Sequence, residues 1–385
     1  MKIIFLTHHE EFRGFSMTRY TQFLNNGFQE LGYDTEVWAP KNFFAKYSTN
    51  KTIKKWLRYI DAFVYFPFIL IRNSKKQAPD TLFVLIDQAL GMWMPNIKNK
   101  KVVIHCHDFI ALKSALGLIK ENPTSWTGKL YQRSIFKGFS KAENFICISN
   151  QTKRDLLHFL NTPRCKIEQV YNAIDPLFKT GNILKARKHI SDFLKLDLKE
   201  GYLLHVGGNG FYKNRTGVIA LYTAWRKQTN FTLPLLMIGY EPSLEIIETY
   251  NSSPYKENIY FLTEVENDFL LKAYQGAKLF LFPSLMEGFG WPIAEAMASG
   301  CPVITTDNAP MNEVGGNAAV YIKRCPENDK LLLWANESAK VIESTLRLNE
   351  EERNTLILKG LEQVKLFDKV AILNQIENFY HNVTV

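Results

Sequence analysis

The chain has 385 residues, of which 46% are hydrophobic and 22% are charged, a composition typical of globular proteins. This length exceeds what one hydrophobic core usually serves, so we expect two domains. The net charge of +9 favours anionic partners such as a nucleotide, a phosphate, a nucleic acid or an acidic membrane surface. Because no run of about 18 apolar residues occurs, we expect no membrane-spanning helix.

The five cysteines are scattered, and none forms a Cys-x-x-Cys pair. This argues against a disulfide framework or a zinc site and is typical of the reducing cytosol. The apolar run in the opening MKIIFLTHHEEF is too short for a signal peptide. These features predict a cytoplasmic protein.

The first half of the chain alternates short apolar strands with helical patterns. Residues 2–8 are expected to form a buried strand, followed by a loop and an amphipathic helix that Ser16 would cap and Gly32 would end. Continuous apolar strands are typical of a parallel sheet covered on both faces. Further strands are expected at residues 34–39, 81–86, 100–107 and 144–149.

The strand–helix pattern restarts in the second half, where a strand within 201–210 leads into a glycine-rich loop. Two such series predict an α/β protein with two doubly wound domains. We expect the boundary within 175–200. Later strands are expected at residues 233–240, 258–262, 278–284 and 302–306.

The segment KTIKKWLRYIDAFVYFPFILIRNSKK (residues 51–76) has an apolar centre between basic ends. The centre is too short to span a bilayer, but its composition fits a helix lying in an anionic membrane interface. A core helix of the first domain with basic ends fits equally well. Both interpretations remain open from the sequence.

The segment SLMEGFGWPIAEAMASGCPVITTD (residues 284–307) carries two glutamates eight residues apart. It follows the strand expected at 278–284, whose carboxyl end faces the ligand crevice of a doubly wound fold. Pro292 suits the start of a short helix, and Gly300 suits its end. Exposed backbone amides at 289–291 would then lie at a helix N-terminus, which favours an anion.

The two carboxylates of this segment require a further explanation. Glu295, one turn inside the expected helix, would repel a phosphate in contact but suits hydroxyls such as a ribose diol. Glu287 could hold hydroxyls of a second sugar. A sugar–diphosphate–ribose ligand lying along the loop accounts for both, although each glutamate alone also fits a structural role.

The pattern Glu-x7-Glu with an internal Gly-Phe-Gly-x-Pro resembles the signature of retaining glycosyltransferase family four, which has the GT-B fold. VGGNGFYKNR, CISNQTKRDL, VYNAIDPLF, HCHDF and FDKVAILNQIENFY resemble other landmarks of that family, in the expected order. The resemblance implies two Rossmann-like domains facing a cleft. They would be an acceptor-side domain (1–178), a nucleotide-sugar-binding domain (179–366) and a C-terminal helix returning to the first domain (367–385).

The resemblance also implies roles in the second domain. Glu295 would bind the donor ribose, Glu287 would contact the transferred sugar, and Lys213 would bind the diphosphate. The arginine that the family often places near this lysine is absent from its usual positions, and Arg215 is the candidate replacement. Further donor-binding candidates are Gly208, Val265, Gly288, Phe289, Gly290 and Trp291.

In the first domain, the resemblance places His107 beside the donor sugar, where it would accept a hydroxyl hydrogen bond. A core histidine is the alternative. His105 points to the opposite face of the same strand and is the weaker candidate. Gly14 matches a loop glycine that would let the acceptor and the diphosphate approach the backbone.

Together these features predict a retaining hexosyltransferase that moves a hexose from a UDP- or GDP-sugar to a saccharide or lipid-linked saccharide, in surface polysaccharide or lipopolysaccharide assembly. No Asp-x-Asp ends a strand, so we expect no catalytic metal and no cofactor. The alternatives are a nucleotide-sugar epimerase on the same fold and a basic anion or nucleic-acid binder. No basic–aromatic recognition motif supports nucleic acid, so we expect none as a partner.

Overall fold

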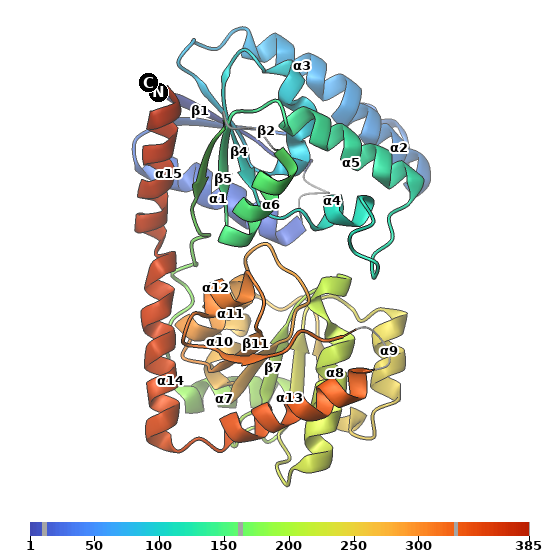
Figure 1. Cartoon of the computed structure of the whole chain (residues 1–385), viewed down its shortest axis with the longest axis vertical. Helices are drawn as coiled ribbons and strands as arrows, with labels where there is room; N and C mark the ends of the chain where they lie inside the picture. The colour runs from blue at the N-terminus through green and yellow to red at the C-terminus, as the bar shows by residue number, and fades with distance from the viewer. Residues whose placement is uncertain (10–13, 161–164, 327–329, 385) are drawn as a thin grey trace. The chain divides into compact units, whose positions relative to one another are not determined.

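The computed structural model describes residues 1–9, 14–160, 165–326 and 330–384 (Figure 1). The chain divides into two compact units. Unit 1 comprises Met1–Tyr171 together with Val370–Val385, and unit 2 comprises Asn172–Lys369.

Unit 1 is built on a parallel sheet of six strands in the order β2-β1-β3-β4-β5-β6. The central strands consist of apolar runs that are buried on both faces, as in β3, where all four residues are inaccessible to solvent. The strands are β1 (Lys2–Leu6), β2 (Asp34–Trp38), β3 (Leu82–Leu85), β4 (Lys101–Cys106), β5 (Asn144–Cys147) and β6 (Lys166–Gln169).

Helices lie on both sides of this sheet (Figure 1). The α-helices are α1 (Gly14–Glu30), α2 (Lys51–Ile60), α3 (Phe66–Ser74), α4 (Ile110–Ala115), α5 (Trp126–Phe139), α6 (Asn150–Leu160) and α15 (Lys369–Thr384). A π-helical turn, η3 (Asp61–Tyr65), joins α2 to α3. The 3-10 segments in the described part of this unit are η2 (Ala45–Tyr47) and η4 (Gln88–Asn96). None of the helices that the structure describes combines the length and the apolar character needed to cross a bilayer.

The C-terminal helix α15 packs within unit 1, as the sequence predicts. Leu373 lies so close to Gly27 of α1 that a Cβ there would approach it to 2.6 Å. The hydroxyl of Tyr33 donates to Glu377 (2.6 Å), and Tyr380 bonds Nε2 of His105 (2.7 Å). The last helix therefore completes the core of the unit that contains the N-terminus.

Unit 2 repeats the architecture with a parallel sheet in the order β12-β11-β10-β7-β8-β9. The strands are β7 (Leu203–Val206), β8 (Leu235–Ile238), β9 (Ile259–Leu262), β10 (Leu279–Phe282), β11 (Val303–Thr306) and β12 (Val320–Ile322). The α-helices are α7 (Ile183–Leu194), α8 (Arg215–Gln228), α9 (Leu244–Asn251), α10 (Asn267–Gly276), α11 (Trp291–Ala298), α12 (Met311–Gly315), α13 (Leu331–Leu346) and α14 (Glu350–Gln363). Among the residues that the structure describes, the 3-10 segments are η5 (Phe211–Lys213), η6 (Lys256–Asn258) and η8 (Val364–Phe367).

The predicted pair of doubly wound parallel sheets is confirmed. The predicted N-cap at Ser16 is wrong, because α1 already begins at Gly14. Gly32 ends α1 as expected, with φ +87° and its N–H bonded to the carbonyl of Gln29 (2.9 Å). The sequence patterns did not predict β6 and β12, each of which is one of the two edge strands of its sheet.

Candidate functional site

The strand order of unit 2 reverses between β7 and β10. The chain runs from β7 outward to β8 and β9, then returns to β10 on the other side of β7. In doubly wound folds the crevice at such a reversal is where ligands bind, beyond the carboxyl ends of the strands. The loops that leave β7 and β10 carry most of the residues singled out in the sequence.

Hydrogen bonds to backbone carbonyls tie these loops together. The N–H of Leu285 donates to the carbonyl of Tyr212 (2.7 Å), and the side-chain amide of Asn214 donates to the carbonyl of Pro283 (3.0 Å). Asn214 also caps α8 by accepting from the N–H of Gly217 (3.2 Å), and it has a left-handed backbone with φ +53°. Because Asn214 is held by these bonds, the backbone position of the preceding residue, Lys213, is fixed as well.

Lys213 and Glu287 form an ion pair between the two loops. The ammonium lies 2.8 Å and 3.0 Å from the two carboxylate oxygens, and the side chains are only 17% and 8% exposed. These residues are 74 positions apart in sequence, and the adjacency of β7 and β10 brings them together. The two candidates therefore share one place in the fold.

Arg215, the first residue of α8, is a second cation in this region and is 3% exposed. Its Nη1 donates to the side chain of Asn209 and to the carbonyl of Tyr240 (2.9 Å). Burial lowers the pKa of Arg215 to about 10, so the group stays charged at neutral pH. Its Nε and Nη2 are buried without a hydrogen-bond partner in the described chain, and unpaired buried donors of this kind are costly.

The glycine-rich loop after β7 makes close contacts on both sides. The ring of Tyr240 lies 3.0 Å from where a Cβ of Gly208 would be. The carbonyl of Gly207 would lie 2.0 Å from a Cβ on Gly239. Both glycines therefore let backbone and ring approach closely. Val265 is partly buried in the loop after β9. It directly follows Glu264, whose φ is +53°.

The loop after β10 leads into α11. Gly290, with φ +105°, is the residue before the helix, and Pro292 is its second residue rather than its first. Phe289 and Gly290 are buried, whereas the sequence predicted exposed backbone there; the ring of Phe289 packs on Phe367 with centroids 5.2 Å apart. The indole of Trp291 donates to the carbonyl of Ala173 (3.0 Å). Gly288 is partly buried beside them.

Glu295 lies within α11 and is 4% exposed. The hydroxyl of Tyr274 on α10 donates to its carboxylate (3.1 Å). Gly300 follows the helix with φ +78°, and the bonds from Gly300 to Met297 and from Cys301 to Ala296 end α11 with a Schellman motif. The sharp end of this helix thus holds Glu295 in a defined position.

His205 on β7 is a buried polar residue that sequence reasoning missed. Its Nδ1 bonds the carbonyl of Leu281 (2.9 Å), while Nε2 has no partner in the described chain and lies 3.0 Å from where a Cβ of Gly207 would be. Burial lowers the pKa of His205 to about 3. The sequence feature that could have identified His205 is a histidine within an otherwise apolar strand.

His205 makes the stability of unit 2 depend on pH. The pKa of His205 is about 6.5 in the unfolded chain and about 3 in the folded protein. Between these pH values the unfolded chain binds a proton that the folded protein does not bind. Stability is therefore lost as pH falls through this window, by about 1.4 kcal/mol per unit where the slope is full. We expect His205→Asn, which keeps a donor for Leu281, to flatten the urea-unfolding stability between pH 6 and pH 4. If the free energy of unfolding of wild type and of His205→Asn falls equally between pH 6 and pH 4, this prediction is wrong.

In unit 1, His107 follows β4 and is 6% exposed. Its Nε2 bonds the carbonyl of Ile86 (2.8 Å), its N–H donates to Gln88 (2.8 Å), and Tyr20 packs edge-on at 4.6 Å. Burial lowers the pKa of His107, although Asp87 opposes this. His107 is therefore a neutral imidazole whose Nε2 carries the proton.

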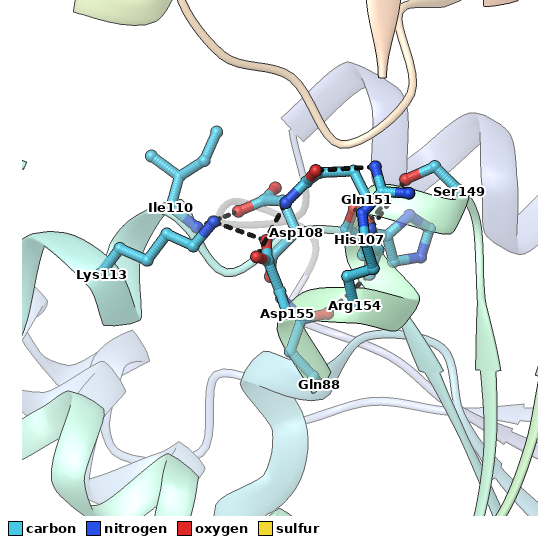
Figure 2. Close-up of polar contacts among 10 residues, drawn as sticks. Gln88, His107, Asp108, Ile110, Lys113, Ser149, Gln151, Arg154 and Asp155 are labelled. Carbon is cyan, nitrogen blue, oxygen red and sulfur yellow. Dashed lines mark hydrogen bonds and ion pairs between the residues drawn. The ribbon is translucent and has the colours of Figure 1, made fainter. Parts of the chain in front are cut away.

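A polar cluster surrounds His107 and Asp108, which directly follow the carboxyl end of β4 (Figure 2). Lys113 of α4 pairs with Asp155 of α6 (2.6 Å), whose second oxygen accepts from Gln151 (2.9 Å). The side chain of Asp108 accepts from the N–H of Ile110, the first residue of α4 (2.9 Å). The cluster holds the two helices against the end of β4.

The other histidines of unit 1 differ in their surroundings. His105 is inaccessible to solvent and lies between the hydroxyls of Tyr20 (2.6 Å) and Tyr380 (2.7 Å), which makes it a core residue. His8, after β1, bonds Asp87, after β3 (2.8 Å). No sequence motif pointed to this pair. Gly14 begins α1, and residues 10–13 before it lie outside the described chain.

The candidates therefore fall into two groups, Gly14 and His107 in unit 1 and all others in unit 2. In unit 2 the structure brings Lys213 and Glu287 into contact and joins Arg215 to the loop of Gly208. Within the described residues, no group of three or more histidine, cysteine or acidic side chains is arranged to hold a metal ion.

Comparison with known proteins identifies relatives for both units. Residues 17–177 match the model described as Glycosyltransferase Family 4, and residues 186–360 match Glycosyl transferases group 1. The O-antigen chain mannosyltransferase RfbU of Salmonella typhimurium is 28% identical over 60% of this chain, and the O-antigen chain mannosyltransferase B of Escherichia coli is 24% identical over 65%. Each match spans 63% of the relative's own length.

Solved structures share the fold across nearly the whole chain. Sucrose-phosphate synthase from Thermosynechococcus elongatus matches with a TM-score of 0.76 and 16% identity, over 99% of this chain and 98% of the other. Anabaena Alr3699/HepE in complex with UDP and glucose matches with a TM-score of 0.70 and 15% identity, over 98% of each chain. These likenesses show the GT-B fold. With family models matching one unit each, the chain belongs to glycosyltransferase family four.

Proposed function

We propose that this chain is a retaining hexosyltransferase that transfers a hexose from a nucleotide sugar to a saccharide acceptor. The observation that carries the proposal is the pair of cations, Lys213 and Arg215, beside the switch point of unit 2. Lys213 is held by Glu287, and Arg215 has two buried donors without a partner in the described chain. A diphosphate is an anion that would satisfy these donors.

The chemistry explains why cations are needed there. Breaking the bond between a sugar and a diphosphate builds negative charge on the leaving phosphate. Positive groups that are already in place stabilise this charge without reorganising, and they act more strongly where water is excluded. Both cations are largely buried. The proposal assigns this neutralisation to the two side chains, without a metal ion.

The other candidates take supporting roles in the proposal. Glu295 binds the ribose hydroxyls, held in place by Tyr274, and Glu287 contacts the transferred sugar as well as Lys213. His107, as a neutral imidazole, accepts a hydroxyl hydrogen bond from the donor sugar through Nδ1. Backbone and ring contacts to the donor come from Gly14, Gly208, Val265, Gly288, Phe289, Gly290 and Trp291.

The proposal also divides the chain by role. Residues 1–178 form the acceptor side, 179–366 bind the nucleotide sugar, and 367–385 form the helix that completes the first domain. Because RfbU and mannosyltransferase B are O-antigen chain enzymes by name, we place this chain in surface polysaccharide or lipopolysaccharide assembly, with a saccharide or lipid-linked saccharide as acceptor.

The donor is a UDP- or GDP-hexose in this proposal. The HepE complex with UDP favours the first, and the mannosyltransferase names favour a mannose donor. A thermal-shift panel of UDP-, GDP-, ADP- and dTDP-sugars tests it. A ligand at 100 times its Kd stabilises the folded state by about 2.7 kcal/mol, which raises the Tm by several degrees.

In this panel we expect one nucleotide class to raise the Tm and the other classes to leave it unchanged. Incubating the same donor with and without a saccharide then separates transfer from epimerisation, because an epimerase converts the donor without an acceptor. A protein that binds DNA in a salt-dependent manner and no nucleotide sugar would contradict the proposal.

A membrane surface is the second partner that we propose. Apolar side chains recur every three or four residues along α2, η3 and α3 and are exposed, with Trp56 61%, Val64 65% and Phe68 63% accessible. The same face includes Ile53, Ile60 and Ile71. Basic residues accompany it at Lys54, Lys55, Arg58, Arg72, Lys75 and Lys76.

This segment is anchored to unit 1 from its other side. Phe66 and Leu70 are buried, Phe66 packs on Trp93 at 4.5 Å, and the carboxylate of Asp61 accepts from the N–H of Phe44 (2.8 Å). The helix α5 lies alongside (Figure 1), where Tyr131 contacts Phe63 and Trp126 is 73% exposed. An apolar face with basic edges suits peripheral binding to the anionic inner face of a membrane.

A further inference from the structure

Ser149 and Thr152 belong to the motif CISNQTKRDL, to which the proposed function gives no role. Both are buried at the start of α6, and the hydroxyl oxygen of Ser149 accepts from the N–H of Thr152 (3.1 Å). The hydroxyl of Thr152 donates to the carbonyl of His107 (3.1 Å), and its oxygen lies 2.9 Å from that of Ser149. Because a carbonyl only accepts, Thr152 gives its proton to His107, and Ser149 donates to Thr152. The motif therefore supports the backbone of His107.

Gln88 holds the same stretch of backbone from the loop after β3 (Figure 2). Its side-chain oxygen accepts from the N–H of His107 (2.8 Å), and its side-chain amide donates to the carbonyl of Asp108. The paired register of β3 and β4 ends at Leu85 and Ile104. The side chain of Gln88 thus joins the two loops beyond the point where the strands stop pairing.

The imidazole of His107 is held as closely as its backbone. Its Nε2 bonds the carbonyl of Ile86 (2.8 Å), and the ring of Tyr20 packs edge-on with centroids 4.6 Å apart. The hydroxyl of Tyr20 is itself bonded to Nδ1 of His105 (2.6 Å). Side chains or carbonyls from α1, the loop after β3 and α6 therefore restrain one residue. Support of this kind is typical of a functional side chain that must be held to within about 0.5 Å.

A comparison with His105 shows why His107 needs such support. His105 lies within β4, and the ladder with Ile146 of β5 fixes its backbone. His107 follows the last residue of β4, where that ladder has ended. Beyond the strand ends a backbone can move unless other groups hold it, and functional residues of α/β folds lie there. Gln88 and Thr152 supply the missing bonds.

From this geometry we infer that Gln88 and Thr152 are positioning residues for His107, which keep its Nδ1 where a hydroxyl of the donor sugar binds. The inference rests on the proposed function and adds two residues to it. Both act through His107, and Ser149 orients the hydroxyl of Thr152.

The variants separate the hydrogen bonds from the packing. Thr152→Val keeps the shape of the side chain but removes the hydroxyl, whereas Thr152→Ser keeps the hydroxyl. Gln88→Met keeps the length of the side chain and removes both of its bonds. Thr21→Val is the matched control, because Thr21 is also buried in unit 1 and bonds the carbonyl of Met17 (2.7 Å) and the hydroxyl of Thr7 (3.2 Å).

Three quantities are measured for each variant, after thermal unfolding has shown that it folds. They are kcat for sugar transfer, the Kd of the free nucleoside diphosphate, and the tautomer of His107. Long-range ¹H–¹⁵N NMR correlations distinguish protonated from unprotonated ring nitrogens, and the signals lost in His107→Gln identify this ring.

We expect Thr152→Val and Gln88→Met to lower kcat by about 10- to 10²-fold, as for a misplaced group in the site. The Kd of the nucleoside diphosphate should stay unchanged, because this ligand lacks the sugar that His107 contacts. The ring of His107 should change from one tautomer, protonated at Nε2, to a mixture of both. Thr152→Ser and Thr21→Val should behave as wild type.

The inference is wrong if either Thr152→Val or Gln88→Met keeps the wild-type kcat, or if His107 keeps a single tautomer in both. It is also wrong if Thr152→Ser or Thr21→Val loses as much activity as Thr152→Val, since the bonds then only stabilise unit 1. If Gln88→Met does not fold, the pair Thr152→Val and Thr152→Ser decides. A wild-type protein that turns over no nucleotide sugar overturns the proposed function, and the inference with it.

Discussion

Replacing Lys213 by alanine is expected to lower kcat for sugar transfer by about 10²- to 10³-fold, or about 3 kcal/mol of transition-state stabilisation. The charge on the leaving diphosphate exists only as the sugar–phosphate bond breaks, so the loss should appear in kcat more than in donor binding. Glu295→Ala should differ in kind, since a residue that holds the ribose hydroxyls in both ground and transition states mainly weakens donor binding. Steady-state kinetics and calorimetry of donor binding separate the two.

The partner of Lys213 complicates this variant and also supplies its control. Glu287 is 8% exposed, so removing the ammonium leaves a nearly buried carboxylate without its cation, which costs stability. The double variant Lys213→Ala/Glu287→Gln removes both charges and restores the fold without restoring the cation. Lys227→Ala, at an exposed position of α8, controls for loss of a lysine in the same unit.

The outcomes separate clearly. If the double variant regains wild-type kcat, Lys213 is structural and the diphosphate assignment is wrong. If Lys213→Ala and Glu295→Ala both keep near-normal activity, the candidate site of unit 2 is wrong as a whole. Because Glu287 is itself proposed to contact the transferred sugar, a double variant that is stable but slower than Glu287→Gln alone supports the proposed role of the cation.

Strands could be predicted where burial on both faces produces a continuous run of apolar residues in the sequence. Strands such as β3 and β10 lie in the sheet interior with both faces covered, so every residue is apolar and the run stands out. The edge strand β6 pairs with one neighbour only, and its residues alternate between partly buried and exposed. The edge strand β12 has three residues, too short for a pattern. These two edge strands therefore escaped prediction, whereas the edge strands β2 and β9 were predicted.

The candidate site could be predicted residue by residue but not as an arrangement. Motif spacing singled out Lys213 and Glu287 separately. Their pairing depends on β10 lying beside β7, and strand order is a property of the whole sheet. The same holds for His8 and Asp87, which follow strands that are adjacent in the sheet and 79 residues apart along the chain.

Hydrogen-bond partners were a second limit on prediction. Nothing in the spacing of the sequence tells that Arg215 is held by Asn209 and Tyr240 with two donors left over. Nor does it tell that Phe289 is buried against Phe367, which is why backbone expected to be exposed is covered. Such details depend on loops whose paths follow from tertiary contacts rather than from periodicity.

The largest effect on membrane binding is expected from removing positive charge at both ends of the helical segment. The variant changes Lys54, Lys55, Arg58, Lys75 and Lys76 to glutamine. Each basic residue near an anionic surface contributes about 1 kcal/mol, so affinity for vesicles containing anionic lipid should fall by roughly three to four orders of magnitude at low salt. Flotation or sedimentation with vesicles measures it, with neutral-lipid vesicles alongside.

A matched control separates local from overall charge. Lysines 179, 185, 188, 195 and 199 are exposed residues of unit 2, and changing them to glutamine lowers the net charge by the same amount. If this control releases the protein equally, attraction is a property of the net charge of +9 and the segment has no special role. If wild type ignores anionic vesicles at low salt, no membrane surface binds here. Release by the first variant alone, together with weaker binding by Trp56→Ser, which removes an exposed apolar contact but no charge, assigns membrane binding to this face.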